Sequence, residues 1–362
     1  MDRPLLQPTD RGLWCEAGGF HVDPWRPVEV AVVTHAHADH AASGCGRYIT
    51  AAPGAGLLSA RVRGADGEVP EIEPREYDEP FDVGGVRLSL HPAGHTLGSA
   101  QVRIEAPNAS PDRNGGVWVV TGDYRPSPEA HAPNTTCAPF EAVTCDTLLT
   151  ESTFGLPIYR WRDPAVIAEE MNEWWRANAA GERTSVIFAY ALGKAQRVLS
   201  MLDASIGPIG LHGAVDTLVG VYREAGVTLP ATQHANRDNA TEFKGRGVII
   251  APPSTDGTPW LRRFKGKHGS RTAFASGWMA VRGRRRWRSA DKGFVVSDHA
   301  DWEGLLATVR ATGASRVGVT HGYAEQVSRY LREVGAGNGP IESFVVPTRY
   351  EGEPADSGEA DS

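Results

Sequence analysis

The sequence predicts an α/β protein in which short buried strands alternate with helices. Apolar runs of strand length, among them VEVAVVT, GVWVVTGD, SVIFAY and RVGVTHG, end in polar loops. Several of them are separated by segments with helical periodicity, which is typical of α/β proteins. Four strands run directly into residues suited to metal binding or proton transfer, at His35, Asp123, Asp298–His299 and His321. Because ligands gather at strand ends in open α/β folds, we expect these side chains to share one site.

The composition is that of a soluble globular protein. Of the 362 residues, 41% are hydrophobic and 22% are charged, and the length suits one large domain or two ordinary ones. No apolar stretch is long enough to cross a bilayer, and the N-terminal MDRPLLQPTDRGLW lacks the basic and apolar regions of a secretion signal. The four cysteines form no CxxC pair, which argues against a cysteine zinc site. We therefore expect a cytoplasmic protein without membrane contact.

Four segments have the pattern of helices. In RDPAVIAEEMNEWWRANAAG, Asp163 is the expected N-cap, Pro164 the first helical residue and Gly181 the stop signal. The segments GKAQRVLSMLDAS, DWEGLLATVRATG and YAEQVSRYLREVG also have helical spacing. Residues 349–362 end in EGEPADSGEADS, an acidic tail rich in Gly, Pro and Ser that predicts disorder.

The segment THAHADH, residues 34–40, crowds ionisable groups directly behind an apolar run. His35 and His37 are alternate residues of an extended or looped segment, so they can converge on one cation. Asp39 and His40 follow closely enough to serve a second cation. The alternative is a solvated loop rich in polar residues, but the HxHxDH spacing favours a metal site.

Three more donors occur in short glycine-containing motifs. They are His95 in PAGHTLGSAQ, Asp123 in TGDY and His321 in THGY. Taken alone, His95 could be a turn residue and His321 a core histidine bonded to backbone. Together with HxHxDH they make seven His and Asp donors, which suit zinc, manganese or iron. Asp123 is the expected bridge between two cations about 3.5–4 Å apart, an arrangement that clamps both oxygens of a displacement at phosphorus.

A basic window stands out against the net charge of −7. From Trp260 to Lys292 there are eleven Lys or Arg residues and one acid, Asp291, so this window carries +10 and the remainder −17. Its densest part is RGRRRWR, from Arg282 to Arg288. Such a cluster suits a phosphate backbone, although a short basic run can also be a solvated face.

The motifs THAHADH, GHTLGSA, TGDY and THGY, in this order, resemble those of the metallo-β-lactamase fold, an αββα sandwich with a dinuclear metal site on one edge. ESTFG and SDHAD, with a long segment between them, resemble the nucleic-acid-processing β-CASP branch, in which an inserted α/β cap domain covers that edge. Within the branch, HPAGHTLGSAQ, FAYALGKAQR, SGWMAVRGRRR and GFVVSDHADWEGLL are most similar to bacterial ligase-associated DNA exonucleases. The similarity extends from Gly12 to Pro347. It implies a metallo-β-lactamase domain in residues 1–154 and 291–348, a β-CASP cap in residues 155–290 and the acidic tail at 349–362.

The resemblance also implies a role for each donor. The first cation would be bound by His35, His37 and His95, and the second by Asp39, His40 and His321, with Asp123 bridging the two. The expected catalytic residues are Asp39, Glu151 and His299, with His299 as a general acid held by Glu151. The chemistry supports that pair independently, because a carboxylate orients a histidine and favours its protonated form. Asp23 in HVDPW fits either a brace for the metal loop or a turn aspartate before proline.

The expected substrate-binding residues lie in the insertion. Lys194 and Arg197 stand where a strand gives way to a helix, which suits either a phosphate site or an ordinary surface helix. Ser276 and Gly277 in ASGW resemble a loop through which the family contacts a backbone phosphate. Trp278 and Trp287 suit either base stacking or the core, and His212 in LHGAV has no evident chemical role. The remaining candidates come from the basic run: Arg284, Arg285 and Arg286.

The function implied by the resemblance is a two-metal DNA exonuclease that hydrolyses phosphodiester bonds in DNA repair beside a DNA ligase. It would use two Zn²⁺ or Mn²⁺ ions and act on DNA that is single-stranded or has free ends. An RNA-processing ribonuclease of the same branch is the first alternative, because His299 in SDHAD is the pattern of the RNA processors. A small-molecule hydrolase and a non-catalytic scaffold are further alternatives. The basic window argues against the former, and the complete set of donors against the latter.

Overall fold

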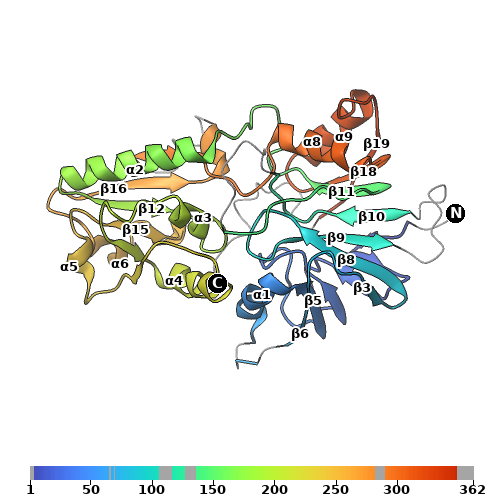
Figure 1. The fold of residues 1–362 in the computed structure, drawn as a ribbon, viewed down its shortest axis with the longest axis horizontal. Coiled ribbons are helices and arrows are strands. Elements are labelled where there is room, and N and C mark those ends of the chain that lie inside the picture. Colours follow the sequence, from blue (N-terminus) through green and yellow to red (C-terminus); the bar gives the residue numbers. More distant parts are fainter. Residues whose placement is uncertain are drawn as a thin grey trace.

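The computed structural model describes residues 4–64, 67–68, 70–105, 116–126, 136–281 and 290–348. Within these residues the fold is mixed α/β with three sheets (Figure 1). The first sheet has the order β1 (Gln7–Thr9), β2 (Gly12–Cys15), β3 (Phe20–Val22), β4 (Val30–Val32), β5 (Arg47–Ala51) and β6 (Glu71–Arg75). The second has the order β19 (Glu342–Val345), β18 (Arg316–Thr320), β11 (Thr147–Glu151), β10 (Val117–Val120), β9 (Ala100–Glu105), β8 (Val86–Pro92) and β7 (Phe81–Val83).

The first two sheets pack face to face around one apolar core. That core contains Phe20 and Val32 from the first sheet and Leu88, Val102 and Leu149 from the second, all at most 3% exposed. Their strands carry apolar residues on the inner face, as expected for stacked sheets. Burial of these side chains is the main stabilising contribution to the sandwich.

Helices cover the outer faces of this sandwich. The helix α1 (Ala55–Val62), which follows the 3₁₀ turn η1 (Ala52–Gly54), packs Leu57 and Leu58 outside the first sheet. The helices α8 (Trp302–Thr312) and α9 (Ala324–Glu333) pack Leu305 and Leu331 against Val317 of the second sheet. The layers therefore run helix, sheet, sheet, helix.

The third sheet comes from a stretch of sequence between β11 and β18. Its strands are all parallel, in the order β14 (Gln233–His234), β13 (Ile209–Leu211), β15 (Val248–Ala251), β12 (Thr184–Phe188), β16 (Ser270–Ala275) and β17 (Lys292–Phe294). Its central strands are buried along their whole length, as parallel sheets with covered faces require. Since β17 pairs with β16, this sheet extends past the boundary expected at residue 290.

The helices of this region surround the third sheet, and together they form the lobe on the left of Figure 1. They are α2 (Pro164–Ala180), α3 (Lys194–Ser200), α4 (Gly213–Glu224), α5 (Ala240–Phe243) and α6 (Pro259–Arg262), with the 3₁₀ turns η3 (Pro253–Thr255) and η4 (Gly277–Ala280). The predicted caps of α2 are confirmed, because the Asp163 side chain accepts from Ala165 N and Gly181 follows the last turn. His212 caps α4 by accepting from Ala214 N, so its role is structural.

The strand pairing explains how distant motifs meet. β10, β11 and β18 are parallel neighbours, so their carboxyl ends lie at one edge of the second sheet. Asp123, Glu151 and His321 stand at or just after these ends. β4 of the first sheet ends just before His35, which brings a fourth chain segment to the same edge. None of the described helices is long and apolar enough to cross a membrane.

Candidate metal centre

The loop that follows β4 is held in place by Asp23. Its carboxylate accepts hydrogen bonds from Thr34 N at 2.7 Å, Thr34 Oγ1 at 2.6 Å and His40 Nδ1 at 2.7 Å. Asp23 adopts a left-handed backbone conformation with φ of 45°, which aspartate tolerates better than most residues. Of the two interpretations from sequence, the structure favours the brace over the simple turn residue.

A second close approach brings the loop against the TGDY motif. Gly122 has φ of 55°, and a Cβ on it would lie 2.4 Å from Thr34 Oγ1. Only glycine therefore permits this contact without a shift of the loop. The consequence is that Asp123, the next residue, lies beside the histidines of the first sheet.

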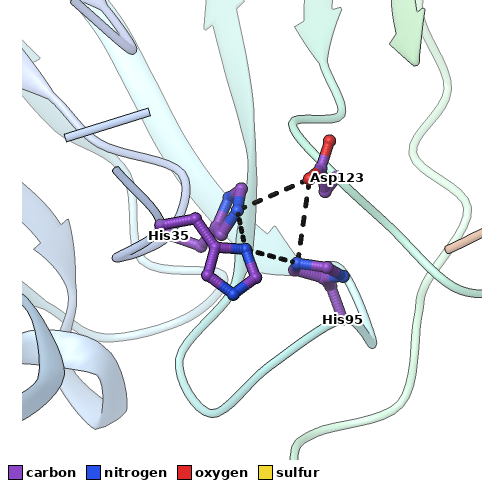
Figure 2. Close-up of side chains that lie close together, drawn as sticks. His35, His95 and Asp123 are labelled. Carbon is purple, nitrogen blue, oxygen red and sulfur yellow. Dashed lines mark hydrogen bonds and ion pairs between the residues drawn. The ribbon is translucent and has the colours of Figure 1, made fainter. Parts of the chain in front are cut away.

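The first group of possible ligands is His35, His37, His95 and Asp123, which are all buried. Figure 2 shows His35, His95 and Asp123 pointing toward one another. His37 Nδ1 lies 3.0 Å from His35 Nε2 and 3.1 Å from His95 Nε2. Asp123 Oδ2 lies 3.6 Å from His35 Nε2 and 3.8 Å from His95 Nε2. A tetrahedral zinc ion with bonds of about 2.0–2.1 Å places its ligand atoms about 3.3 Å apart. The four atoms therefore have the spacing of a coordination shell.

The other ring nitrogens of these histidines face hydrogen-bond partners. His95 Nδ1 donates to the carbonyl of Asp298 at 2.8 Å, so the lone pair of its Nε2 faces the other ligand atoms of the group. His37 Nε2 lies 3.4 Å from the carbonyl of Leu192, and His35 Nδ1 lies 3.1 Å from Thr34 Oγ1. Such partners fix the tautomer and the ring orientation that a metal-binding histidine needs.

The second group is Asp39, His40 and His321. His40 Nε2 lies 3.6 Å from Asp39 Oδ2, while its Nδ1 is taken by Asp23. Among the described residues, His40 Nε2 and His321 Nδ1 are buried atoms without a hydrogen-bond partner. Buried polar atoms are nearly always satisfied, so two orphaned ring nitrogens at one place fit a cation.

Asp123 lies between the two groups. Its Oδ2 is 3.6 Å from His35 Nε2 in the first group and also 3.6 Å from His40 Nε2 in the second. Burial, with Glu151 nearby, raises the pKa of Asp123 to about 7. A carboxylate in such a setting is stabilised in its charged form by neighbouring cations, which suits a bridging ligand.

The surroundings do not shift the pKa of all the histidines in the two ligand groups in the same direction. Burial lowers the pKa of His37 to about 3 and that of His35 and His95 well below the ordinary range, which keeps these rings neutral. Neutral imidazole is the form that binds a metal. His40 differs, because although burial acts to lower its pKa, Asp39, Asp123 and Asp23 together raise it well above the usual value.

His299 and Glu151 form a pair beside Asp123. The two carboxylate oxygens of Glu151 lie 2.9 and 3.0 Å from His299 Nδ1. Glu151 also accepts from Tyr124 N at 2.9 Å, which fixes the carboxylate. Burial opposes protonation of His299, but Glu151 and Asp123 outweigh it and raise the pKa of this histidine. The ring is therefore held with Nε2 as its remaining polar atom.

A cleft opens beside His299 and contains some of the expected substrate-binding residues. Lys194, Ser276, His37, Trp278 and His299 are among its lining residues. Lys194 is not a free surface cation, because it is buried and its Nζ forms an ion pair with Asp298. Ser276 Oγ accepts from Trp278 N at 3.3 Å, and Gly277 is buried against Phe154.

Arg197 lies away from the cleft. It is 4% exposed, and its Nη1 donates to the carbonyl of Ser297 at 2.9 Å. Burial, together with Arg125, lowers its pKa to about 9. All residues of α3 from Lys194 to Leu199 are buried, so α3 is not the ordinary surface helix that was one of the two interpretations from sequence. The loop after β17 contacts this helix through Ser297 and Asp298, which bond Arg197 and Lys194, and local sequence does not reveal these contacts.

Some residues singled out from the sequence lie outside the described residues, and some groups that support the site were not predicted. Arg284, Arg285, Arg286 and Trp287 lie outside the described residues. The supporting carbonyls of Leu192 and Asp298 were not predicted, because a backbone group leaves no mark on residue type. The ion pair of Lys194 was missed because its partner is distant in sequence.

Comparison with known proteins points to nucleic-acid chemistry in relatives. No family model matches the chain. A protein of Opitutus terrae named "Probable DNA ligase" is 32% identical over 326 residues, covering 90% of this chain and 30% of that protein. "Endoribonuclease YSH1" of Yarrowia lipolytica is 28% identical over 49% of this chain and 23% of its own length. "Cleavage and polyadenylation specificity factor 73" of Drosophila melanogaster is 28% identical over 38% of this chain and 18% of its own length.

The chain thus spans less than a third of the length of each of these curated relatives. Among solved structures, a protein of unknown function from Enterococcus faecalis has the same fold, with a TM-score of 0.57. That match covers 88% of this chain and 79% of the other at 13% identity, so it supports the fold alone.

Proposed function

We propose that the chain is a metallo-β-lactamase/β-CASP nuclease that uses two divalent cations to hydrolyse phosphodiester bonds at DNA ends. The observation that carries this proposal is the pair of ligand groups meeting at Asp123, with His299 and Glu151 beside it. A single catalytic cation bound by the first group would not explain why a second group of possible ligands lies beside it. Two adjacent cations are typical of enzymes that displace an oxygen at phosphorus.

The two cations would be Zn²⁺ or Mn²⁺, since both accept imidazole and carboxylate ligands. His35, His37 and His95 would hold the first, Asp39, His40 and His321 the second, and Asp123 both. When bound, the cations would supply Lewis-acid activation of the phosphodiester. The chain contributes the geometry, because Asp23 and the carbonyls of Leu192 and Asp298 orient the ligands.

His299 would act as the general acid. Its Nδ1 is held by Glu151, and the residue lines the cleft, so Nε2 is the atom available to give a proton to the leaving oxygen. Glu151 and Asp123 raise the pKa of His299, which favours the protonated form that a general acid needs. Asp39 would contribute by holding the second cation, in line with its expected catalytic role.

The choice of DNA, and of a role beside a ligase in repair, follows from the extent of the match to the ligase-named relative. That match covers 90% of this chain, whereas the YSH1 match covers 49%. The second candidate is RNA cleavage, which the endoribonuclease names of the other relatives favour. The basic window suits the phosphates of either polymer.

The test uses end-labelled single-stranded DNA and RNA of one sequence, with added Mn²⁺ or Zn²⁺. We expect stepwise release of mononucleotides from DNA. Asp39→Ala should abolish it, and Asp82→Ala, which changes an exposed aspartate away from the site, should not. Preferential cutting of RNA would establish the second candidate instead. Cleavage of neither polymer would overturn the proposal.

A further inference from the structure

Two of the three histidines in the first ligand group bond to backbone carbonyls that lie outside the two-sheet sandwich. His37 faces the carbonyl of Leu192, which lies between β12 and α3. His95 donates to the carbonyl of Asp298, which lies between β17 and α8. Both carbonyls belong to loops at the end of the third sheet. In the second ligand group, His40 is oriented instead by Asp23, which directly follows β3 of the first sheet.

One ion pair joins these two loops. Lys194, two positions after Leu192, forms an ion pair through its Nζ with the carboxylate of Asp298. The Lys194 side chain is 7% exposed and that of Asp298 is 2% exposed. A buried pair of this kind is costly to break, because removal of one partner leaves the other charge unpaired in a low dielectric. The pair therefore fixes the distance between the carbonyls that support His37 and His95.

The same geometry argues against a phosphate-binding role for this lysine. Its charge is already matched by Asp298, and its side chain is almost fully enclosed. A residue that neutralises substrate phosphates would instead present an exposed ammonium group. Lys194 does line the cleft, so the experiment must separate the two roles.

We propose that Lys194 is a positioning residue that, through Asp298, clamps the third-sheet loops onto the first cation site and so sets its affinity. This inference rests on the proposed function, because it requires that the first group binds a cation. Loss of partners that orient metal ligands typically weakens metal binding by 10–100-fold. The effect should fall on the first group and spare the second.

The experiment measures Zn²⁺ affinity by competition with a chromophoric chelator in two backgrounds. Asp39→Ala removes a second-group ligand and leaves the first group complete. His37→Ala does the reverse. We expect Lys194→Met to weaken Zn²⁺ binding by about 10–100-fold in the first background and to leave it unchanged in the second. Asp298→Asn should give the same pattern, and Lys265→Met, at an exposed lysine, should change neither.

Each other result is decisive. Equal loss of affinity in both backgrounds would mean that the pair supports the fold as a whole, and would overturn the proposal. Unchanged affinity with a smaller salt dependence of DNA binding would make Lys194 a phosphate ligand instead. Failure of both backgrounds to bind Zn²⁺, before any change at Lys194, would overturn the proposed function itself.

Discussion

Replacement of Asp23 by asparagine tests how the second cation site is built. The carboxylate of Asp23 accepts three hydrogen bonds, one of them from His40 Nδ1 at 2.7 Å. The amide in Asp23→Asn keeps the side-chain shape but offers only one acceptor oxygen. If its oxygen stays on Thr34 N, its NH₂ faces His40, which must then accept at Nδ1. The proton moves to Nε2, the atom that should bind the cation.

If the amide rotates by half a turn instead, its NH₂ faces Thr34 N, so two hydrogen-bond donors oppose each other there. The expected loss is that of one charge-assisted hydrogen bond, about 1.5–3 kcal/mol. At about 1.4 kcal/mol for each factor of ten, the second cation should bind roughly 10–100-fold more weakly. The backbone should tolerate the change, because asparagine also adopts the left-handed conformation found at Asp23.

The assay is a Zn²⁺ titration of the His37→Ala background, which retains the second ligand group. Asp78→Asn is a matched control, because Asp78 also has a positive φ, of 64°, and bonds a histidine, His91, at 2.6 Å. That pair should not affect the second site. Unchanged Zn²⁺ affinity in Asp23→Asn would refute the assignment of Asp23 as the residue that orients His40.

Four further predictions concern the general acid and its partner, the fold and the basic run. Glu151→Gln removes the carboxylate that raises the pKa of His299, so the rate, which requires protonated His299, should decline at lower pH than in the wild type; an unmoved alkaline limb would contradict this. His299→Ala should lower the rate by about 10²–10⁴ while metal content stays near wild type, as kinetics and metal analysis can show. Gly98→Ala should lower the unfolding free energy by about 3 kcal/mol or more, because its Cβ would lie 2.0 Å from Gly54 N. The control is Gly85→Ala, at a similar φ but with open space around the Cβ, which should lower it by only about 1–2 kcal/mol. Denaturant titrations measure both values. Replacement of Arg284, Arg285 and Arg286 by alanine should reduce the slope of log affinity for DNA against log salt concentration by about 2–3. A slope equal to that of the wild type would assign the three arginines to a solvated face.

The sequence predicts the donor residues that the structure brings together, but not the groups that support them. HxHxDH and the polar residues at strand ends mark His35, Asp123 and His321, because a metal requires these residue types at these places. The helix caps were equally visible, as Asp163 shows, because capping depends on neighbours two or three positions away. These features are local, or depend on a strand end that local patterning defines.

The supports are non-local. His37 and Leu192 are 155 positions apart, and His95 and Asp298 are 203 apart. No periodicity or spacing relates a side chain to a carbonyl at that distance. Lys194 is an example. A lysine at a helix start suggests phosphate binding, and only the folded structure shows that its charge is paired with Asp298 from the loop after β17.

The order in which the chain is synthesised gives the position of His321 a further consequence. His35, His37, His95 and Asp123 all lie in the first 123 residues, whereas His321 follows β18, which pairs with β11 only after the whole third sheet has been made. A nascent chain that has not yet reached residue 321 therefore lacks one donor of the second ligand group. Chains terminated before residue 321 would lack this donor, so the activity that we propose would arise only after translation has passed β18.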